Sequence, residues 1–177
     1  MLPDILEPGL TVVFVGTAKS RASAAAGHYY AHPQNMFWSL LEATGLTGGV
    51  FVPSTEDRSV TRFGVGLTDL VASRAASSDS LLRARDFDVP AFVDRIERYG
   101  PAVVAFNGGE SAKRVARHLG HPPPAVGPAG WAVAGAEAYR LPSSSSANAA
   151  GGYEAKRLAW VAFGDWVRGL GTAKAPG

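Results

Sequence analysis

Residues 10–15 (Leu-Thr-Val-Val-Phe-Val), which end at Gly16, restrict the possible folds more than any other segment of the chain. The run is short, rich in β-branched residues and apolar at consecutive positions, which is typical of a parallel strand buried on both faces. Residues 101–106 (Pro-Ala-Val-Val-Ala-Phe) repeat this pattern, and residues 137–141 are predicted as a third core strand. A strand covered on both faces needs helices on each side of the sheet, which indicates an α/β fold.

Segments with helical periodicity, bounded by residues that favour helix ends, alternate with these strands. The predicted helices cover residues 34–43, 90–99, 110–119 and 152–170. Residues 64–70 are predicted to form a turn into a short strand or loop, and the proline-rich residues 121–130 a stiff surface connection. Strands alternating with helices predict an α/β sandwich with a mostly parallel sheet, whose ligand-binding loops lie at the carboxyl ends of the strands.

Length and composition narrow the class of protein. A chain of 177 residues with 46% hydrophobic residues is predicted to form a single domain over residues 1–177, with a core at about 10–168 and a frayed tail at 172–177. The chain has no cysteine, which excludes disulfides, a thiol nucleophile and thiolate metal sites. No apolar run is long enough to span a bilayer and the first residues lack a basic signal region, so we expect a soluble, cytoplasmic protein.

Two further patterns bear on ligands. His28 and His32 have the spacing of a metal-binding pair, but Pro33 and the lack of a third ligand argue against a metal, so we expect no metal site. The formal net charge of +2 permits contact with a phosphate backbone without requiring it.

Three unusual segments follow predicted strands: residues 16–38, 64–70 and 141–149. The string at 29–38 (Tyr-Tyr-Ala-His-Pro-Gln-Asn-Met-Phe-Trp) is the specific part. Together the segments resemble the uracil-DNA glycosylase superfamily, nearest to its mismatch-specific uracil/thymine and hypoxanthine branches, over about residues 10–168. The resemblance implies a three-layer α/β/α sandwich around a four-stranded, mostly parallel sheet. It also implies a monomeric enzyme that flips a damaged base out of DNA, hydrolyses its N-glycosidic bond and leaves an abasic site.

The resemblance also suggests a base pocket. Tyr30 matches the aromatic residue that stacks on the base in relatives; the alternative is a core tyrosine with a buried hydroxyl partner. We expect the pocket to be completed by Gly16, Thr17, Ala18, His32 and Asn107. Relatives of the mismatch-specific branch carry a water-positioning asparagine where this chain has Ala18.

Two residues are candidates for the role that Ala18 cannot perform. Asn35 matches the asparagine that the hypoxanthine branch is thought to use, and its carboxamide oxygen can orient water. It can equally cap the helix that follows, since asparagine is favoured there. Asp69 stands where related sequences tend to have asparagine, and a carboxylate stabilises a cationic sugar better than an amide does. The alternative is a loop aspartate that bonds nearby backbone amides.

Contacts with DNA are expected at two loops. The first holds Lys19, Ser20, Arg21 and Ser23, which replace the Pro-Gly of most relatives; solvated loop charges are the alternative. The second matches the minor-groove loop of the family, with Arg140, Lys156 and Arg157 nearby to add charge; a flexible serine linker is the alternative. Its residues are Ser143, Ser144, Ser145, Ser146 and Asn148. It lacks a large apolar wedge, which favours single-stranded or mismatched DNA.

These patterns leave three functions open. The first is a repair glycosylase, a cofactor-free hydrolase of N-glycosyl bonds, with uracil as the favoured base and hypoxanthine or xanthine as alternatives. The second is a non-catalytic protein of the same fold that binds damaged or single-stranded DNA, which Ala18 makes credible. The third is an α/β protein that binds small nucleotides and has no role in repair; DNA affinity with steep salt dependence would exclude it.

Overall fold

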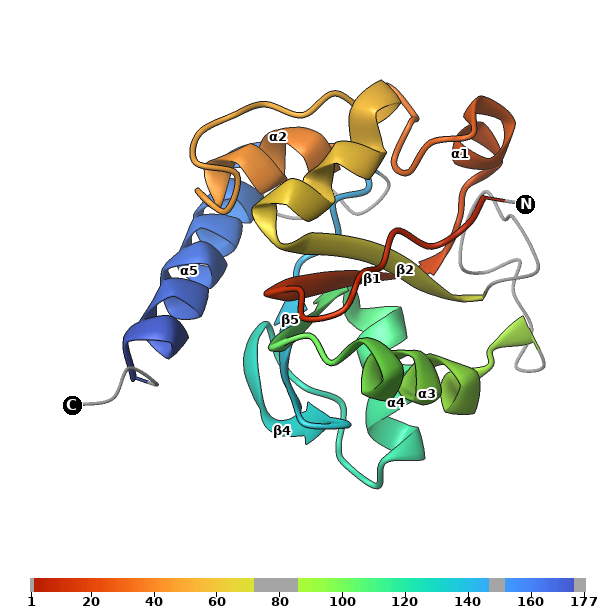
Figure 1. Cartoon of the computed structure of the whole chain (residues 1–177), viewed down its shortest axis with the longest axis vertical. Coiled ribbons are helices and arrows are strands. Elements are labelled where there is room, and N and C mark those ends of the chain that lie inside the picture. The colour runs from red at the N-terminus through yellow and green to blue at the C-terminus, as the bar shows by residue number, and fades with distance from the viewer. Residues whose placement is uncertain (1, 72–85, 147–151, 174–177) are drawn as a thin grey trace.

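The structure, a computed structural model, describes residues 2–71, 86–146 and 152–173. A five-stranded sheet with the order β2-β1-β3-β5-β4 forms its centre (Figure 1). The strands are β1 (Val12–Ala18), β2 (Val65–Val71), β3 (Val103–Asn107), β4 (Gly127–Val133) and β5 (Ala136–Leu141). Strands β2, β1, β3 and β5 pair in parallel, whereas β4 pairs antiparallel with β5 at one edge. The predicted mostly parallel α/β sheet is therefore confirmed.

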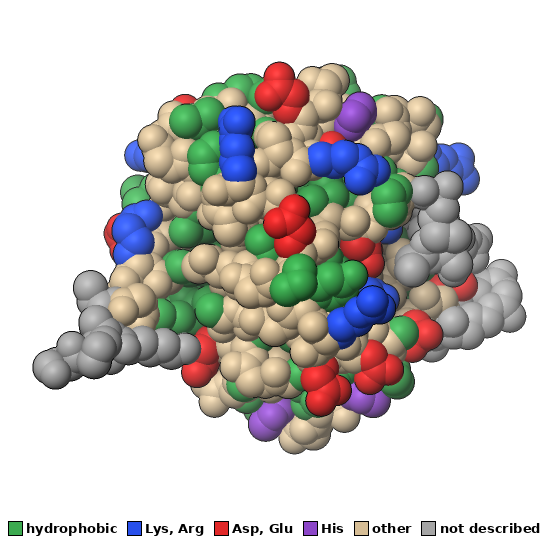
Figure 2. Space-filling view, in the orientation of Figure 1, with side chains coloured by type: hydrophobic (Ala, Val, Ile, Leu, Met, Phe, Trp, Pro, Cys, Tyr) green, Lys and Arg blue, Asp and Glu red, His purple; other side chains and the backbone are tan. Residues whose placement is uncertain are grey.

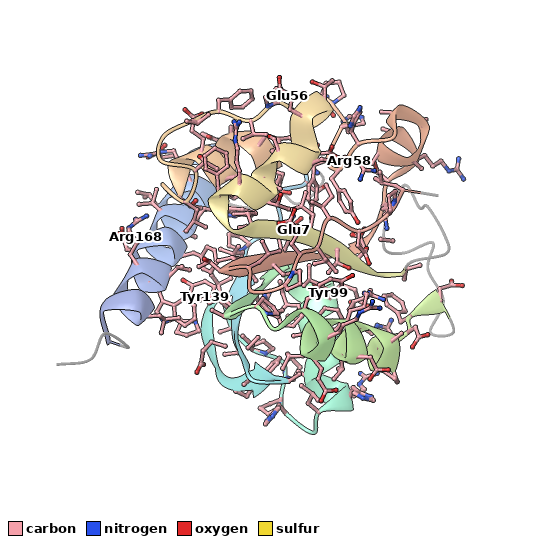
Figure 3. The ribbon with its side chains drawn as sticks, viewed as in Figure 1. Glu7, Glu56, Arg58, Tyr99, Tyr139 and Arg168 are labelled. Carbon is pink, nitrogen blue, oxygen red and sulfur yellow. The ribbon has the colours of Figure 1, made fainter. Side chains whose placement is uncertain are left out.

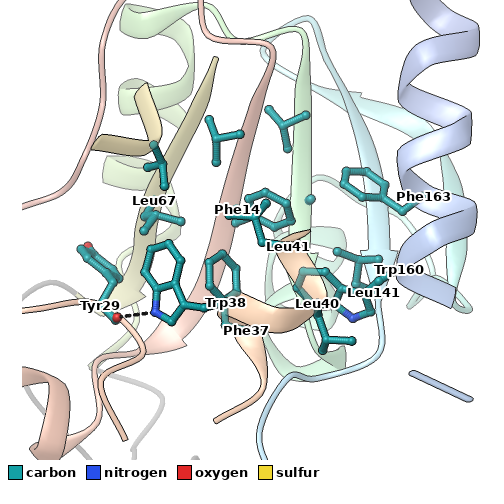
Figure 4. Close-up of a cluster of buried hydrophobic side chains, with 14 of the residues drawn as sticks. Phe14, Tyr29, Phe37, Trp38, Leu40, Leu41, Leu67, Leu141, Trp160 and Phe163 are labelled. Atoms are coloured by element: carbon teal, nitrogen blue, oxygen red, sulfur yellow. Dashed lines mark hydrogen bonds between the residues drawn. The ribbon is translucent and has the colours of Figure 1, made fainter. Parts of the chain in front are cut away.

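Alternate residues of the central strands face opposite layers of helices. Val12 and Phe14 of β1 belong to a core shared with α2 (Phe37–Ala43), the 3₁₀ segment η1 (Ser54–Phe63) and α5 (Gly152–Ala173). Figure 4 shows this cluster, in which the Phe14 ring stacks on that of Trp160 with centroids 5.6 Å apart.

The opposite face of the sheet is covered by α3 (Val89–Tyr99) and α4 (Gly109–His118). Val13 and Val15 of β1 contribute to this second core. Helices on both faces give the three-layer sandwich that the resemblance implied. The short helix α1 (Arg21–Ala26) follows β1 directly.

An arginine side chain fixes the packing contact between α2 and α5. Arg168 Nη1 of α5, labelled in Figure 3, donates a hydrogen bond of 2.9 Å to the carbonyl oxygen of Thr44, the residue that ends α2. Gly164 lies against the same carbonyl so closely that a Cβ there would overlap it. The two helices therefore pack as one layer, and this layer supports the segment that precedes α2.

The edge of the sheet differs from what the sequence predicts. It has five strands, not four, and β4 overlaps residues 121–130, which were predicted as a connection. Glycine and proline weaken strand propensity, but an edge strand needs partners on one side only, and β4 tolerates an irregular register between Pro128 and Ala132. Helix α1 and segment η1 were also not predicted. Strand β2 forms where the sequence left a strand or a loop open.

Candidate functional site

The candidate site is a cleft of about 680 Å³ at the carboxyl ends of the parallel strands. This is the edge where α/β sheets hold ligands. Every described residue assigned to the site from the sequence lines it except Arg21. The predicted residues that line it are Gly16, Thr17, Ala18, Lys19, Ser20, Ser23, Tyr30, His32, Asn35, Asp69, Asn107, Ser143, Ser144, Ser145 and Ser146. Asn148 lies outside the described residues.

A buried ion pair lies inside the cleft. Lys19 Nζ is 3.2 Å from Asp69 Oδ2, and the two side chains are only 7% and 3% exposed. Burial raises the pKa of the Asp69 carboxyl to about 6, while the nearby Lys19 ammonium opposes this rise. A carboxylate that titrates near neutrality in a cleft is a common feature of functional sites.

Gly16 provides the space that this carboxylate occupies. The parallel register places Gly16 of β1 opposite Asp69 of β2. A Cβ atom on Gly16 would overlap Asp69 Oδ1 and would lie 3.3 Å from the hydroxyl oxygen of Tyr30. The absence of a side chain at Gly16 thus lets a carboxylate and a phenol converge over one point of the strand.

Tyr30 presents an aromatic wall to this point. Its ring stacks on the buried ring of Phe37, with centroids 4.0 Å apart and planes 16° from parallel. The Tyr30 hydroxyl is buried and makes no hydrogen bond of good geometry to a described residue, and burial raises its pKa although Asn107 lies close enough to lower it. The backbone of Tyr30 has a φ of 50°, an uncommon conformation for a tyrosine. The ring is therefore held against Phe37 while lining the cleft.

The loop that carries Tyr30 is fixed by Asp57, a residue that sequence reasoning missed. Asp57 Oδ2 accepts a hydrogen bond of 2.8 Å from Tyr29 N, and Oδ1 lies 3.2 Å from His28 Nδ1. Asp57 is 1% exposed. Trp38 Nε1 donates to the carbonyl oxygen of Tyr29 at 3.1 Å. These contacts fix both sides of the bend that presents Tyr30.

Asn35 has its carboxamide oxygen engaged by two donors. Oδ1 accepts hydrogen bonds from Phe37 N, at the first residue of α2, at 3.0 Å and from Ser144 Oγ at 2.9 Å. The N-cap position of α2 is Met36, and Asn35, one residue before it, bonds the first N–H group of the helix. The oxygen that would orient a water is already used, which weakens the case for Asn35 as the water-positioning group.

The serine loop, residues 143–146, is held to the sheet and to α5. Ser144 N donates to Asn107 Oδ1 at 2.9 Å, and Asn107 Nδ2 donates to Ser144 Oγ at 2.8 Å. Lys156 Nζ donates to the carbonyl oxygen of Ser145 at 2.9 Å. The described part of this loop is thus anchored, in contrast to the flexible-linker alternative.

The predicted DNA-contacting groups of the first loop differ in their surroundings. Ser20 Oγ accepts a hydrogen bond of 3.0 Å from Ser23 N and so caps α1. Arg21 is exposed and lies outside the cleft, whereas Lys19 is turned inward onto Asp69. On the face shown in Figure 2, basic and acidic side chains are interspersed.

Several residues that line the cleft were not assigned to it from the sequence. They are Tyr29, Gln34, Gly108, Gly109, Glu110 and Arg140. Arg140 had been noted only as a neighbouring charge; its Nη1 donates to the carbonyl oxygen of Pro124 at 2.7 Å. A Cβ on Gly109 would lie 2.7 Å from Arg140 Nη2, so glycine at this helix start admits the guanidinium. Arg157, by contrast, pairs with Glu154 on the exposed side of α5.

The histidines of the cleft and the helices bear on metal binding and on membrane insertion. His32 Nδ1 accepts a local hydrogen bond of 3.1 Å from Gln34 N. Within residues 2–71, 86–146 and 152–173, no three metal-ligating side chains gather. No helix among them is long and apolar enough to cross a bilayer.

Two comparisons with known proteins bear on the family and the fold of this chain. A sequence profile described as "Uracil DNA glycosylase superfamily" matches residues 3–164. The fold is similar to the solution NMR structure of a protein from Methanosarcina acetivorans that is provisionally named a uracil DNA glycosylase. The TM-score is 0.64 at 22% identity, over 94% of this chain and 96% of the other. At this identity the likeness to that structure establishes the fold, while the profile match establishes the family.

Proposed function

This chain belongs to the uracil DNA glycosylase superfamily, and we propose that it flips a deaminated base, uracil first among the candidates, into the cleft and hydrolyses its N-glycosidic bond. The product is DNA with an abasic site. The observation that carries this proposal is the convergence of a buried carboxylate, Asp69, and a supported aromatic ring, Tyr30, over Gly16.

The aromatic wall suits a flipped base. A flat ring stacks on any base and contributes about 1–3 kcal/mol in such contacts. Because Phe37 supports the Tyr30 ring from behind, stacking on a base costs little further ordering of that side chain. A cleft of about 680 Å³ has room for either a pyrimidine or a purine, so hypoxanthine and xanthine remain substrates to be tested.

Asp69 is the group we assign to the chemical step. Positive charge develops on the sugar as the base departs, and an ionised carboxylate in a water-poor site stabilises that charge strongly. Asp69 can act in this way, or by orienting the attacking water, above the pKa of about 6 that burial gives it. Ala18 has no polar group, and Asn35 Oδ1 is already bonded to Phe37 N and Ser144 Oγ. In this proposal Asn35 shapes the pocket and Asp69 performs the chemistry.

The decisive experiment is base release from oligonucleotides that carry uracil or hypoxanthine, single- and double-stranded, followed by alkaline cleavage of abasic sites. The wild-type protein is expected to cleave at uracil. Asp69→Asn is expected to lose about 10²–10³-fold in rate, and Asn35→Ala less. Asp94→Asn, an exposed aspartate on α3, is the matched control and should leave the rate unchanged.

Each other result has a definite meaning. Absence of product from every substrate would overturn the proposal that the protein is a glycosylase. Salt-dependent DNA binding without product would support instead the non-catalytic DNA-binding protein that Ala18 favours. Full activity of Asp69→Asn together with loss in Asn35→Ala would transfer the catalytic role to Asn35.

A further inference from the structure

We propose that Lys19 is a positioning residue that fixes the Asp69 carboxylate inside the cleft and balances its charge, and that it does not contact DNA phosphate. This inference rests on the proposed function, because it gives Lys19 its role through Asp69. It departs from the sequence-based expectation that Lys19 binds DNA with Ser20 and Arg21.

The surroundings of Lys19 are those of an interior cation. Its side chain is 7% exposed, with Nζ 3.2 Å from Asp69 Oδ2 and 5.4 Å from the centroid of the Tyr29 ring. An ammonium between a carboxylate and an aromatic face is stabilised by both. A lysine that binds phosphate instead keeps its ammonium at the surface, where the backbone of DNA can reach it. Arg21, two residues on, has that exposure.

The other charged groups around Asp69 leave this role to Lys19. Asp4 raises the pKa of the Asp69 carboxyl and Arg95 lowers it, but both effects are smaller than that of Lys19. Arg95 Nη2 donates to the backbone carbonyl oxygen of Asp69 at 2.7 Å, and its Nε lies 3.4 Å from Asp4 Oδ2. Arg95 therefore mainly offsets Asp4. The phenols of Tyr29 and Tyr30 also face Asp69 and remain neutral, since burial raises the pKa of both.

Removal of Lys19 has a direct consequence for Asp69. Burial and Asp4 would then act on the carboxyl with only Arg95 opposing them, so its pKa would rise toward or beyond neutrality. At pH 7 a larger fraction of the protein would carry a neutral Asp69, which cannot stabilise a cationic sugar. The defect should therefore be largest at low pH and recover as the pH rises.

The test compares Lys19→Met, Lys19→Arg and Arg21→Met in single-turnover base release between pH 5 and 9, and in DNA binding at several salt concentrations. Lys19→Met is expected to move the acid limb of the rate profile upward by about one pH unit or more. The salt dependence of DNA binding by Lys19→Met should equal that of the wild type. Lys19→Arg keeps the charge and should restore most of the profile, while Arg21→Met should leave the acid limb unchanged.

Two outcomes would overturn the proposal. One is a Lys19→Met protein whose acid limb in the pH–rate profile is unmoved, while the slope of log binding constant against log salt concentration falls in magnitude by about one. That change in slope is the one expected for the loss of a phosphate contact. The other is an acid limb in Lys19→Met identical to that of the wild type.

A second measurement separates this inference from the proposed function. The pKa of the Asp69 carboxyl can be followed by carbon NMR in the wild type and in Lys19→Met, without any substrate. A higher value in Lys19→Met supports the positioning role even if no base is released, and an unchanged value overturns it. The resolved spectrum also reports that the variant is folded.

Discussion

Asn107 and Ser144 hold each other through two hydrogen bonds, 2.8 Å from Asn107 Nδ2 to Ser144 Oγ and 2.9 Å from Ser144 N to Asn107 Oδ1. Ser144 Oγ in turn donates a hydrogen bond of 2.9 Å to Asn35 Oδ1. One buried serine thus joins the end of β3, the serine loop and the start of α2. Three segments far apart in sequence form one wall of the cleft through this residue.

Asn107→Ala should loosen that wall. The change leaves Ser144 N and Oγ without their partner, so we expect a loss of about 1–3 kcal/mol in the free energy of unfolding. Affinity for DNA should also fall, because the serine loop is the proposed phosphate contact. Urea unfolding and fluorescence anisotropy with a labelled oligonucleotide measure the two effects. The exposed Ser146 offers the control Ser146→Ala, whose stability should stay within about 0.5 kcal/mol of wild type; equal losses in both variants would contradict the role of the Asn107–Ser144 pair.

Gly16→Ala should disable the site through a steric clash alone. The added methyl group would overlap Asp69 Oδ1, so the carboxylate must move away from the point it shares with the Tyr30 hydroxyl. Such overpacking costs about 1–3 kcal/mol in stability, and we expect base release to fall by about 10²-fold or more because misplaced groups lose their catalytic effect. Gly169→Ala in α5 is the matched control, since no described residue beyond the backbone of its own helix lies within 4 Å of its Cβ position. Wild-type rates in Gly16→Ala would show that Asp69 does not act from this position.

Asp57→Ala should release the bend that presents Tyr30. Tyr29 N would lose its acceptor in a buried setting, which costs about 1–3 kcal/mol. Base release should weaken mainly through a higher KM, because Tyr30 would no longer be held in place before the base arrives. The adjacent Glu56, exposed and labelled in Figure 3, provides the control Glu56→Ala. An unchanged KM in a folded Asp57→Ala protein would remove Asp57 from this role.

The central strands and the long helices could be predicted from the sequence because burial leaves a local pattern. The apolar run that became β1 and the periodic residues of α3 are examples. Strand β4 has no such pattern, since an edge strand of glycine and proline is stabilised by its partner β5 and not by its own composition.

The chemistry of the site was predicted less fully than its location. Tyr30, Asn35 and Asp69 were each identified with an alternative role, and the choice between the two roles depends on neighbours that are distant in sequence. The Lys19–Asp69 pair joins residues 50 positions apart, and the register that places Gly16 opposite Asp69 is not encoded locally. Likewise, Ser144 as a second donor to Asn35 becomes visible only once the serine loop is folded against α2.

The free energy of unfolding should depend on pH because Asp69 has a different pKa in the folded protein and in the unfolded chain. Burial raises the pKa of this carboxyl from 3.8 to about 6, so between these values the folded protein binds more protons than the unfolded chain. The free energy of unfolding contributed by Asp69 therefore falls as the pH rises from about 4 to about 6, and is constant above. Asp69→Asn lacks this titration. Its stability relative to wild type should increase over that window by up to about 3 kcal/mol.

Urea unfolding of wild type and Asp69→Asn at pH 4, 5, 6 and 7 measures this difference directly. Asp94→Asn, which makes the same substitution at an exposed carboxylate, is the matched control. The sign is the discriminating feature. A carboxylate held mainly by Lys19 would have a lowered pKa and would make the wild type relatively more stable as the pH rises, whereas one dominated by burial gives the opposite slope. An increase in the relative stability of wild type between pH 4 and 6 would therefore contradict the balance of burial and ion pairing that we assign to Asp69.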